Sequence, residues 1–131
     1  MIFDILIPVL EQRFPGRGAK RTTQPRPCIT FPAIHPEVGD LQIYDDGDEV
    51  TLIAGNFTHG HFSNYDDIAK EDKERMIAAD VADFLEKLFS DQVVFWGSHK
   101  GRGGWRVVDS NTAGSKKGEK EYVWSGPKKS S

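Results

Sequence analysis

Two histidines stand one residue apart in the stretch GNFTHGHFSNYDD: His59 and His61. On a β-strand, side chains at positions i and i+2 lie on the same face, so this pair can offer two imidazoles to one metal ion. A zinc site takes three or four protein ligands. The candidates for the others are His35, His99, Asp66 and Asp67. The pair keeps a zinc-binding protein or a metal-dependent hydrolase open as an alternative, but polar strand residues explain it more simply.

Four carboxylates cluster at residues 45–49, where the sequence reads DDGDE. An EF-hand calcium loop needs ligands at alternate positions, Gly at the sixth and Glu at the twelfth, and this stretch has no such pattern. The dipeptide Asp46-Gly47 lies between two runs that alternate apolar and polar residues, which is typical of a type I′ hairpin. We therefore interpret the acidic cluster as a turn.

Glycines and basic residues alternate in GSHKGRGGW, residues 97–105. Such a loop can present backbone N–H groups and cations to a phosphate, and the tryptophans beside it can stack on a nucleic-acid strand. It has neither the spacing of a Walker A loop nor that of a dinucleotide fingerprint. The candidate anion-binding residues are His99, Lys100, Arg102 and Arg106. The net charge of −3 makes nucleic acid a possible partner but not the favoured one.

The sequence lacks the usual marks of an enzyme, a secreted protein and a membrane protein. It has no GxSxG elbow, and Cys28 precedes an apolar strand, where burial is expected. A single cysteine cannot form an internal disulfide, which favours the cytoplasm. No apolar run approaches the ~20 residues that span a bilayer, so we expect no membrane partner.

Charge is distributed unevenly along the chain. Residues 1–35 carry five Lys or Arg and two Asp or Glu, residues 36–96 four and fifteen, and residues 97–131 eight and three. The corresponding net charges are +3, −11 and +5. An acidic middle between basic ends predicts surfaces of opposite potential, which steer partners more than they determine a fold.

The hydrophobic pattern predicts a short N-terminal helix over residues 1–14 and a long amphipathic helix over 66–89, with Lys70, Glu74, Asp80 and Glu86 on its outer side. Residues 41–53 predict a hairpin that pairs Ile43 with Val50 and Leu41 with Leu52. If its second strand continues without a bulge or turn at Gly55 or Gly60, His59 and His61 lie on the face opposite Leu52. Residues 92–96 and 105–109 predict a second hairpin, and residues 121–124 a last strand.

These elements predict an α+β fold, in which an antiparallel β-sheet built from hairpins has the long helix packed on one face. We expect one domain over residues 1–126, with a basic, Pro- and Gly-rich loop at 15–27. Residues 127–131 are expected to form a disordered C-terminal tail.

The predicted function is that of a small non-enzymatic protein-binding or adaptor domain, for example a bacterial immunity-like protein. Its partner would meet the sheet face away from the helix, together with the acidic helix. The residues expected on that surface are Tyr44, Phe57, Asp80, Asp83 and Glu86. An apolar patch on an uncovered sheet face is typical of a partner surface, and one tryptophan is expected to join Tyr44 and Phe57 there.

Overall fold

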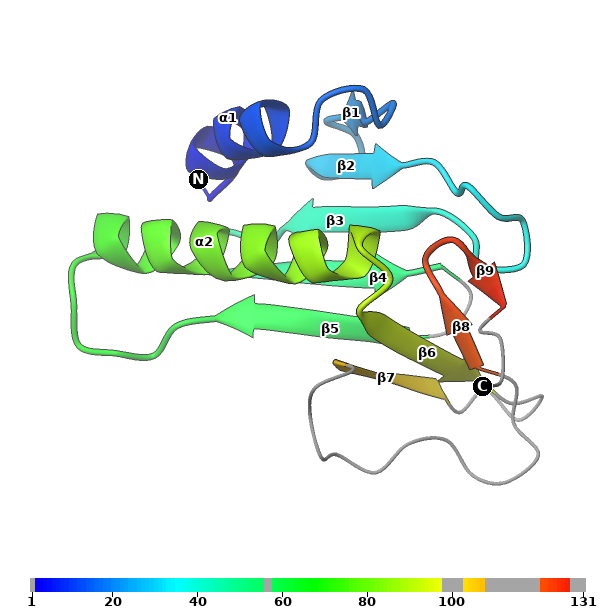
Figure 1. Cartoon of the computed structure of the whole chain (residues 1–131). Coiled ribbons are helices and arrows are strands. Elements are labelled where there is room, and N and C mark those ends of the chain that lie inside the picture. The colour runs from blue at the N-terminus through cyan, green and yellow to red at the C-terminus, as the bar shows by residue number, and fades with distance from the viewer. Residues whose placement is uncertain (1, 56–57, 98–102, 108–120, 128–131) are drawn as a thin grey trace.

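The computed structural model describes residues 2–55, 58–97, 103–107 and 121–127 (Figure 1). It contains two helices, α1 (Ile2–Arg13) and α2 (Lys70–Phe89), and two antiparallel sheets. The first sheet has the order β1-β2-β3-β4-β5, so each strand pairs with its neighbour in the chain. Its strands are β1 (Lys20–Thr22), β2 (Cys28–Phe31), β3 (Leu41–Asp45), β4 (Glu49–Ala54) and β5 (Thr58–Ser63). The predicted α+β class is confirmed.

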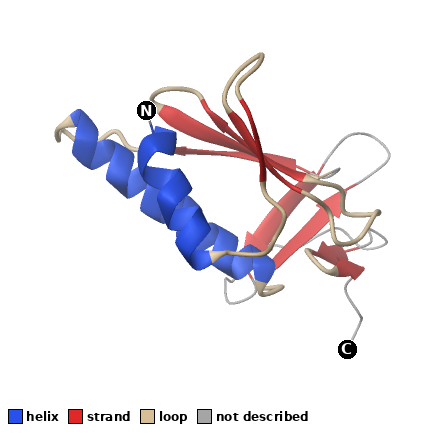
Figure 2. Cartoon of the chain, turned by 90° about the horizontal axis from the view of Figure 1, so that it is seen from above, coloured by secondary structure: helices blue, strands red, loops and turns tan. Residues whose placement is uncertain are grey.

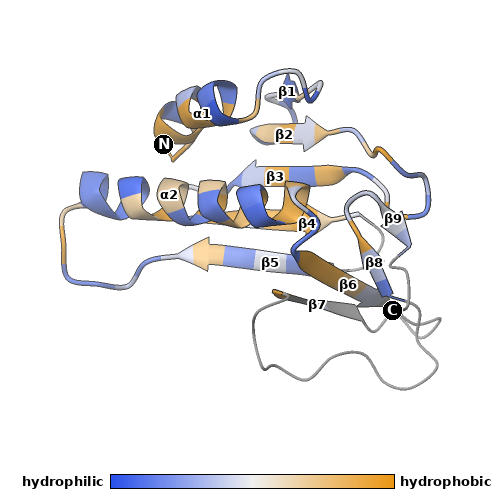
Figure 3. Ribbon diagram, in the orientation of Figure 1, coloured by the Kyte–Doolittle hydropathy of each residue, from blue (hydrophilic) through white to orange (hydrophobic). Residues whose placement is uncertain are grey.

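Both helices lie on the same side of the five-stranded sheet (Figure 2). The apolar stripe expected on α2 is buried there, since Ile77, Val81 and Leu88 are at most 2% exposed. The sheet contributes alternate residues of β3 and β4 to the same core, while the outer side of α2 is hydrophilic (Figure 3). The core residues of β3 and β4 are Leu41, Ile43, Val50, Leu52 and Ala54. This two-layer arrangement forms because the strands, with a period of two residues, and the helices, with a period of 3.6, each have one apolar side that is buried against the other layer.

The long helix begins later than its sequence predicts. It starts at Lys70 instead of Asp66, and its N-cap residue Ala69 supplies no side-chain hydrogen bond. The Asn64 side chain closes a turn of its own instead, because Asn64 Oδ1 accepts the Asp66 N–H at 2.8 Å. Asn often competes with a helix in this way. Glu74, expected on the outer side, is buried, because it lies one turn before Ile77 and Ala78.

The β3–β4 hairpin forms, but its predicted register is wrong by two residues. Ile43 pairs with Leu52, Asp45 pairs with Val50, and the Asp46 N–H donates to the Glu49 carbonyl at 2.9 Å. Gly47, with φ of 94°, is therefore the first of the two turn residues, the position that a type II′ turn gives to glycine. The alternation of apolar and polar residues does not distinguish these two registers, since a shift of two residues leaves every side chain on the same face.

A further strand, β5, returns antiparallel along β4, where the sequence suggested one continuous strand. Thr51 pairs with His61, and Ile53 pairs with His59. Cross-strand partners share a face, so both histidines lie on the side away from the helices, with Tyr44. We call this side the outer face. The predicted side of the two histidines is correct, although a turn and not a straight strand places them there.

The second sheet has the order β7-β6-β8-β9. Its strands are β6 (Val93–Gly97), β7 (Gly103–Val107), β8 (Glu121–Val123) and β9 (Gly126–Pro127). The predicted hairpin is confirmed with slightly different bounds, and β9 occupies part of the expected tail. Residues 128–131 lie outside the described residues. The basic loop at 15–27 contains the short edge strand β1.

Aromatic rings join the two sheets to the helices. The Phe89 ring lies 5.2 Å from Phe14, 5.1 Å from Phe31 and 5.6 Å from Trp124, measured between centroids. Trp124 is 2% exposed and Phe95 is 1% exposed, so both rings belong to the core. The Tyr122 hydroxyl donates to Glu37, which raises the pKa of Tyr122 together with its burial. The second sheet is thereby fixed to the loop between β2 and β3.

Candidate functional site

A chain of polar contacts crosses the outer face next to the β3–β4 turn. The Thr51 hydroxyl donates to the Asp46 carboxylate and lies 3.1 Å from His61 Nδ1. His61 Nδ1 also lies 3.5 Å from a Glu49 carboxylate oxygen. Arg26 closes the other end of the chain, because its guanidinium donates to Asp46 at 2.9 Å. The outer face thus carries an ordered polar network beside the β3–β4 turn.

The network determines which nitrogen of His61 carries the proton. Thr51 has a single hydroxyl hydrogen, and an ionised Asp46 can only accept. Thr51 therefore accepts from His61, so that Nδ1 of His61 is protonated and Nε2 keeps its lone pair when the ring is neutral. The side chain of His61 is 49% exposed, so the ring remains accessible to solvent.

We expect the Thr51→Val variant to lose about 1–2 kcal/mol of unfolding free energy, since it removes the two hydrogen bonds of the hydroxyl without a change of shape. The fraction of His61 with the proton on Nδ1 should fall, because its best acceptor is gone. Urea unfolding and ¹⁵N NMR of the imidazole check these two expectations. Thr51→Ser keeps the hydroxyl and should retain the wild-type tautomer; equal spectra for Thr51→Val and wild type would contradict the assigned network.

Tyr44 lies at the centre of the outer face, and it is half-buried. The Arg26 guanidinium stacks on its ring at 4.0 Å, and its pKa is raised by burial and by its interaction with Cys28, against the opposing charge of Arg26. Cys28 is 6% exposed, and its Sγ lies 3.7 Å from the Thr30 hydroxyl oxygen. The prediction that Cys28 is a buried strand residue is confirmed. The place of Tyr44 on the partner surface stays a prediction.

The two histidines do come together, with ring centroids 5.4 Å apart. Within the described part of the chain, however, no group of three or more His, Cys, Asp or Glu side chains is placed to hold a metal ion. His35 lies beside Gly126 of β9, and His99 lies outside the described residues. Zinc at this pair therefore stays a prediction from the sequence.

The acidic residues predicted on α2 differ in their surroundings. Asp80 is exposed to solvent. Asp83 and Glu86 both bind Arg13 of α1, and the Asp83 contact measures 3.2 Å. These two side chains therefore help to dock α1 on α2, so a charge reversal there would disturb the helix pair as well as any partner surface.

Other predicted residues fall where side chains are not described. Phe57 and three of the anion-binding candidates, His99, Lys100 and Arg102, lie outside the described residues, and for Arg106 only the backbone pairing with Val94 is described. The tryptophan expected beside Tyr44 is not Trp105, whose ring packs on Phe84 of α2 at 4.8 Å. The anion-binding loop thus stays a prediction.

The four carboxylates of the turn have separate roles. On the helix side, Asp45 is 3% exposed and accepts the backbone N–H groups of Phe3 and Gly47, each at 2.9 Å. It therefore binds the first turn of α1, in the manner of an N-cap residue supplied from a distant strand. Asp46 and Glu49 belong to the polar network of the outer face. Asp48 is exposed at the tip of the turn.

A hollow of about 350 Å³ lies between this turn and the start of α2. We call it the turn groove. Its lining includes Gly47, Asp48, Tyr65, Ile68, Lys73 and Ile77. Tyr65 and Ile68 belong to the segment that connects β5 to α2, and Met76 adjoins this segment because its Sδ lies 3.4 Å from the Asn64 amide nitrogen. Exposed apolar side chains thus lie beside charged ones at a hollow that the sequence pattern did not predict.

The sequence held a weak signal for these residues. Met76 falls outside the apolar stripe of α2, and Tyr65 and Ile68 flank an Asp-Asp pair in a polar connection. Apolar residues that no core position explains are worth noting, but a single exposed one is ordinary. Only the folded chain shows that the three are neighbours.

The fold and the site together define a two-layer α+β domain with an exposed apolar hollow at one end. Comparison of the chain with protein-family models, with curated proteins and with solved structures finds no match. Neither described helix is long and apolar enough to cross a lipid bilayer. What the protein does must therefore be argued from its own geometry.

Proposed function

We propose that this protein is a small, non-enzymatic protein-binding domain that receives its partner in the turn groove. The observation that supports this proposal is the exposure of two large apolar side chains that line one hollow, 89% for Tyr65 and 39% for Ile68. A third, Met76, is 46% exposed and contacts the lining residue Asn64. Binding hot spots are typically built from aromatic residues at a pocket, and Met is enriched at interfaces. Single exposed apolar residues are common, whereas several gathered at one hollow are typical of a docking surface.

The surroundings of the groove suggest the chemistry of the partner. Residues 45–49 and 64–77 carry nine Asp or Glu and three Lys or Arg, a net charge of −6. A partner segment with an apolar anchor between Lys or Arg residues would complement this surface, and its approach would be accelerated by the charge. Nucleic acid fits poorly, because its phosphates would be repelled. An adaptor or an immunity-like protein that covers a basic site has this form.

The same proposal places the protein in the cytoplasm. Cys28 is a buried free thiol, and it is the single cysteine of the chain. A reducing compartment suits such a protein.

We expect a Tyr65→Ala/Ile68→Ser variant to capture at least about tenfold less of the partner than the wild-type protein does, since hot-spot truncations commonly cost more than 1.4 kcal/mol each. The measurement is affinity capture from a lysate of the source organism, quantified by mass spectrometry, at low and at high salt. The variant should fold normally, because both side chains are at least 39% exposed.

Ile34→Ser is the matched control, because Ile34 is 61% exposed but follows β2 at the opposite end of the sheet (Figure 1). It should capture the same proteins as the wild type does. A partner set that the groove variant retains would contradict the proposal. If the captured partner is a second copy of the chain, light scattering would show a dimer that only the groove variant loses.

A further inference from the structure

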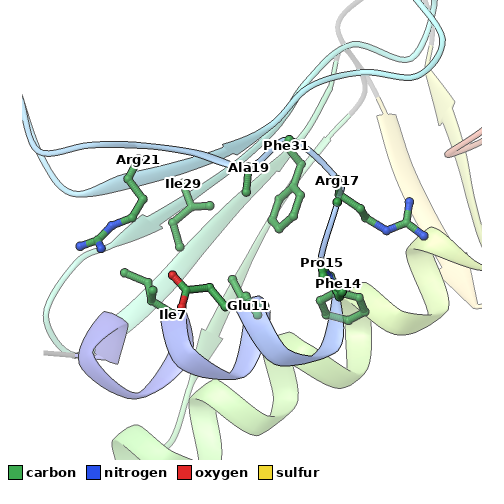
Figure 4. A pocket seen from close by; sticks show the side chains of 12 residues that line it. Ile7, Glu11, Phe14, Pro15, Arg17, Ala19, Arg21, Ile29 and Phe31 are labelled. Carbon is green, nitrogen blue, oxygen red and sulfur yellow. The ribbon is translucent and has the colours of Figure 1, made fainter.

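A second hollow, of about 330 Å³, lies between α1 and the strands β1 and β2, far along the sheet from the β4–β5 edge (Figure 4). We call it the α1–β1 cleft. Ile7 of α1 and Phe14, which follows α1, form its lower wall. Ile29 and Phe31 of β2 form its upper wall, and Ala19 lies on the same side. Its volume is near the lower limit of pockets that hold small molecules.

The apolar walls of the cleft are held in place by the core. Phe31 is 1% exposed and Ile29 is 2% exposed, so neither side chain can move without disturbing the packing beneath it. Phe14 and Phe31 both contact Phe89 of α2. A ligand would therefore enter a preformed site, which avoids the entropic cost of ordering the walls.

Three charged residues line this cleft: Glu11, Arg17 and Arg21. The Arg17 guanidinium stacks on the Phe89 ring at 4.1 Å and points away from the cleft (Figure 4), which leaves two opposite charges, one on each wall. Glu11 projects from α1 into the cleft, and Arg21 lies at the end next to Ile7, on the strand side (Figure 4). Among the described residues, neither makes an ion pair or a hydrogen bond, whereas Arg13 binds Asp83 and Glu86. The charges at the cleft are thus available to a ligand.

This combination favours one class of ligand. A purely anionic ligand would meet the carboxylate of Glu11, and a purely cationic ligand would meet the guanidinium of Arg21. A zwitterion satisfies both, since a carboxylate suits Arg21 and an ammonium suits Glu11. We infer that the α1–β1 cleft binds a free apolar α-amino acid of about the size of leucine or phenylalanine, with its side chain against Ile29 and Phe31.

The inference concerns a ligand site separate from the turn groove, so it stands or falls independently of the proposed function. Tyr65→Ala/Ile68→Ser should leave amino-acid binding unchanged. The cleft variants described below should in turn leave partner capture unchanged.

The test is calorimetric and NMR titration of the full chain with L-leucine and L-phenylalanine. We expect a dissociation constant of about 0.1–1 mM, given the few non-hydrogen atoms of these ligands. N-acetyl-phenylalanine lacks the ammonium group and phenylalaninamide lacks the carboxylate, so each should bind at least about tenfold more weakly. Glycine, which has no apolar side chain, should not bind measurably.

Variants assign the two charges. Glu11→Gln should weaken phenylalanine binding about tenfold, so that phenylalanine binds hardly more tightly than N-acetyl-phenylalanine. Arg21→Gln should also weaken phenylalanine binding about tenfold, so that phenylalanine binds hardly more tightly than phenylalaninamide. Ala19→Leu should abolish binding by filling the cleft, and it should fold because Ala19 is exposed. Lys20→Gln is the control for Arg21, since Lys20 is its neighbour in β1 but points to the outer face.

Three outcomes would overturn the inference. The first is the absence of binding of either amino acid at ligand concentrations of about 10 mM, tenfold above the weakest expected dissociation constant. The second is binding of N-acetyl-phenylalanine as tight as that of phenylalanine, which would indicate an apolar acid as the ligand. The third is binding that survives Ala19→Leu while chemical shifts change elsewhere, which would place the ligand outside the cleft.

Discussion

The Gly55→Ala variant is expected to lose about 3–5 kcal/mol of unfolding free energy, the largest effect among the substitutions considered. Gly55 follows β4 and has a φ of 55°, in the left-handed region. A Cβ atom at this position would lie 1.8 Å from the carbonyl oxygen of Val38. The neighbour is backbone, so it cannot turn aside as a flexible side chain can.

The close approach of Gly55 has a structural purpose. The loop between β2 and β3 crosses the end of β4 here, and the Asp40 carbonyl accepts the Gly55 N–H at 3.0 Å. The crossing inserts Val38 into the core, where it is 1% exposed. An alanine would push the loop outward and withdraw Val38, so the cost combines backbone strain with lost core packing.

Urea unfolding monitored by circular dichroism measures this loss, and the melting temperature should fall by about 10–20 °C. Gly47→Ala is the matched control: its φ is 94°, but a Cβ there would have no atom within 4 Å. That variant should lose only about 1 kcal/mol, from backbone strain alone. Equal losses for the two variants would show that the crossing loop is not in contact with Gly55.

The Asp45→Ala variant is expected to lose about 2–3 kcal/mol. Asp45 is almost fully buried and accepts two backbone N–H groups, one from Phe3 in the first turn of α1 and one from Gly47 in the turn. Alanine would leave the Phe3 N–H without this acceptor and would remove a negative charge from the positive end of the α1 dipole. The first part of the fold to open should be α1.

Hydrogen exchange checks this order of opening, because the amides of α1 should lose protection before those of α2 do. Asp48→Ala, in the same turn but exposed, is the control and should change stability by at most about 0.5 kcal/mol. Asp45→Asn keeps one oxygen acceptor, so its stability should lie between those of Asp45→Ala and Asp48→Ala. If Asp45→Ala and Asp48→Ala were equally stable, the remote capping of α1 would be refuted.

The same turn links stability to the proposed partner surface. Gly47, whose N–H binds Asp45, lines the turn groove. Loss of Asp45 would therefore loosen the groove as well as α1. Partner capture is accordingly tested with Tyr65 and Ile68, whose exposed side chains contribute little to the core.

The sequence by itself determined the class of the fold and most of its elements. Periods of 2 and 3.6 residues specify which side of each strand and helix is apolar, and this information is local. The burial of Cys28 and the apolar stripe from Ile77 to Leu88 follow from it. The register of the β3–β4 hairpin does not, because its alternation is unchanged by a shift of two residues.

Only the tertiary structure decided where function can reside. Tyr65 and Ile68 share one groove with the β3–β4 turn, and Glu11 and Arg21 lie on opposite walls of one cleft whose apolar wall is β2. The role of Asp45 as a cap for α1 joins residues 42 positions apart. No local pattern encodes such contacts, since they depend on how the helices settle on the sheet, and that is decided by the packing of the whole core.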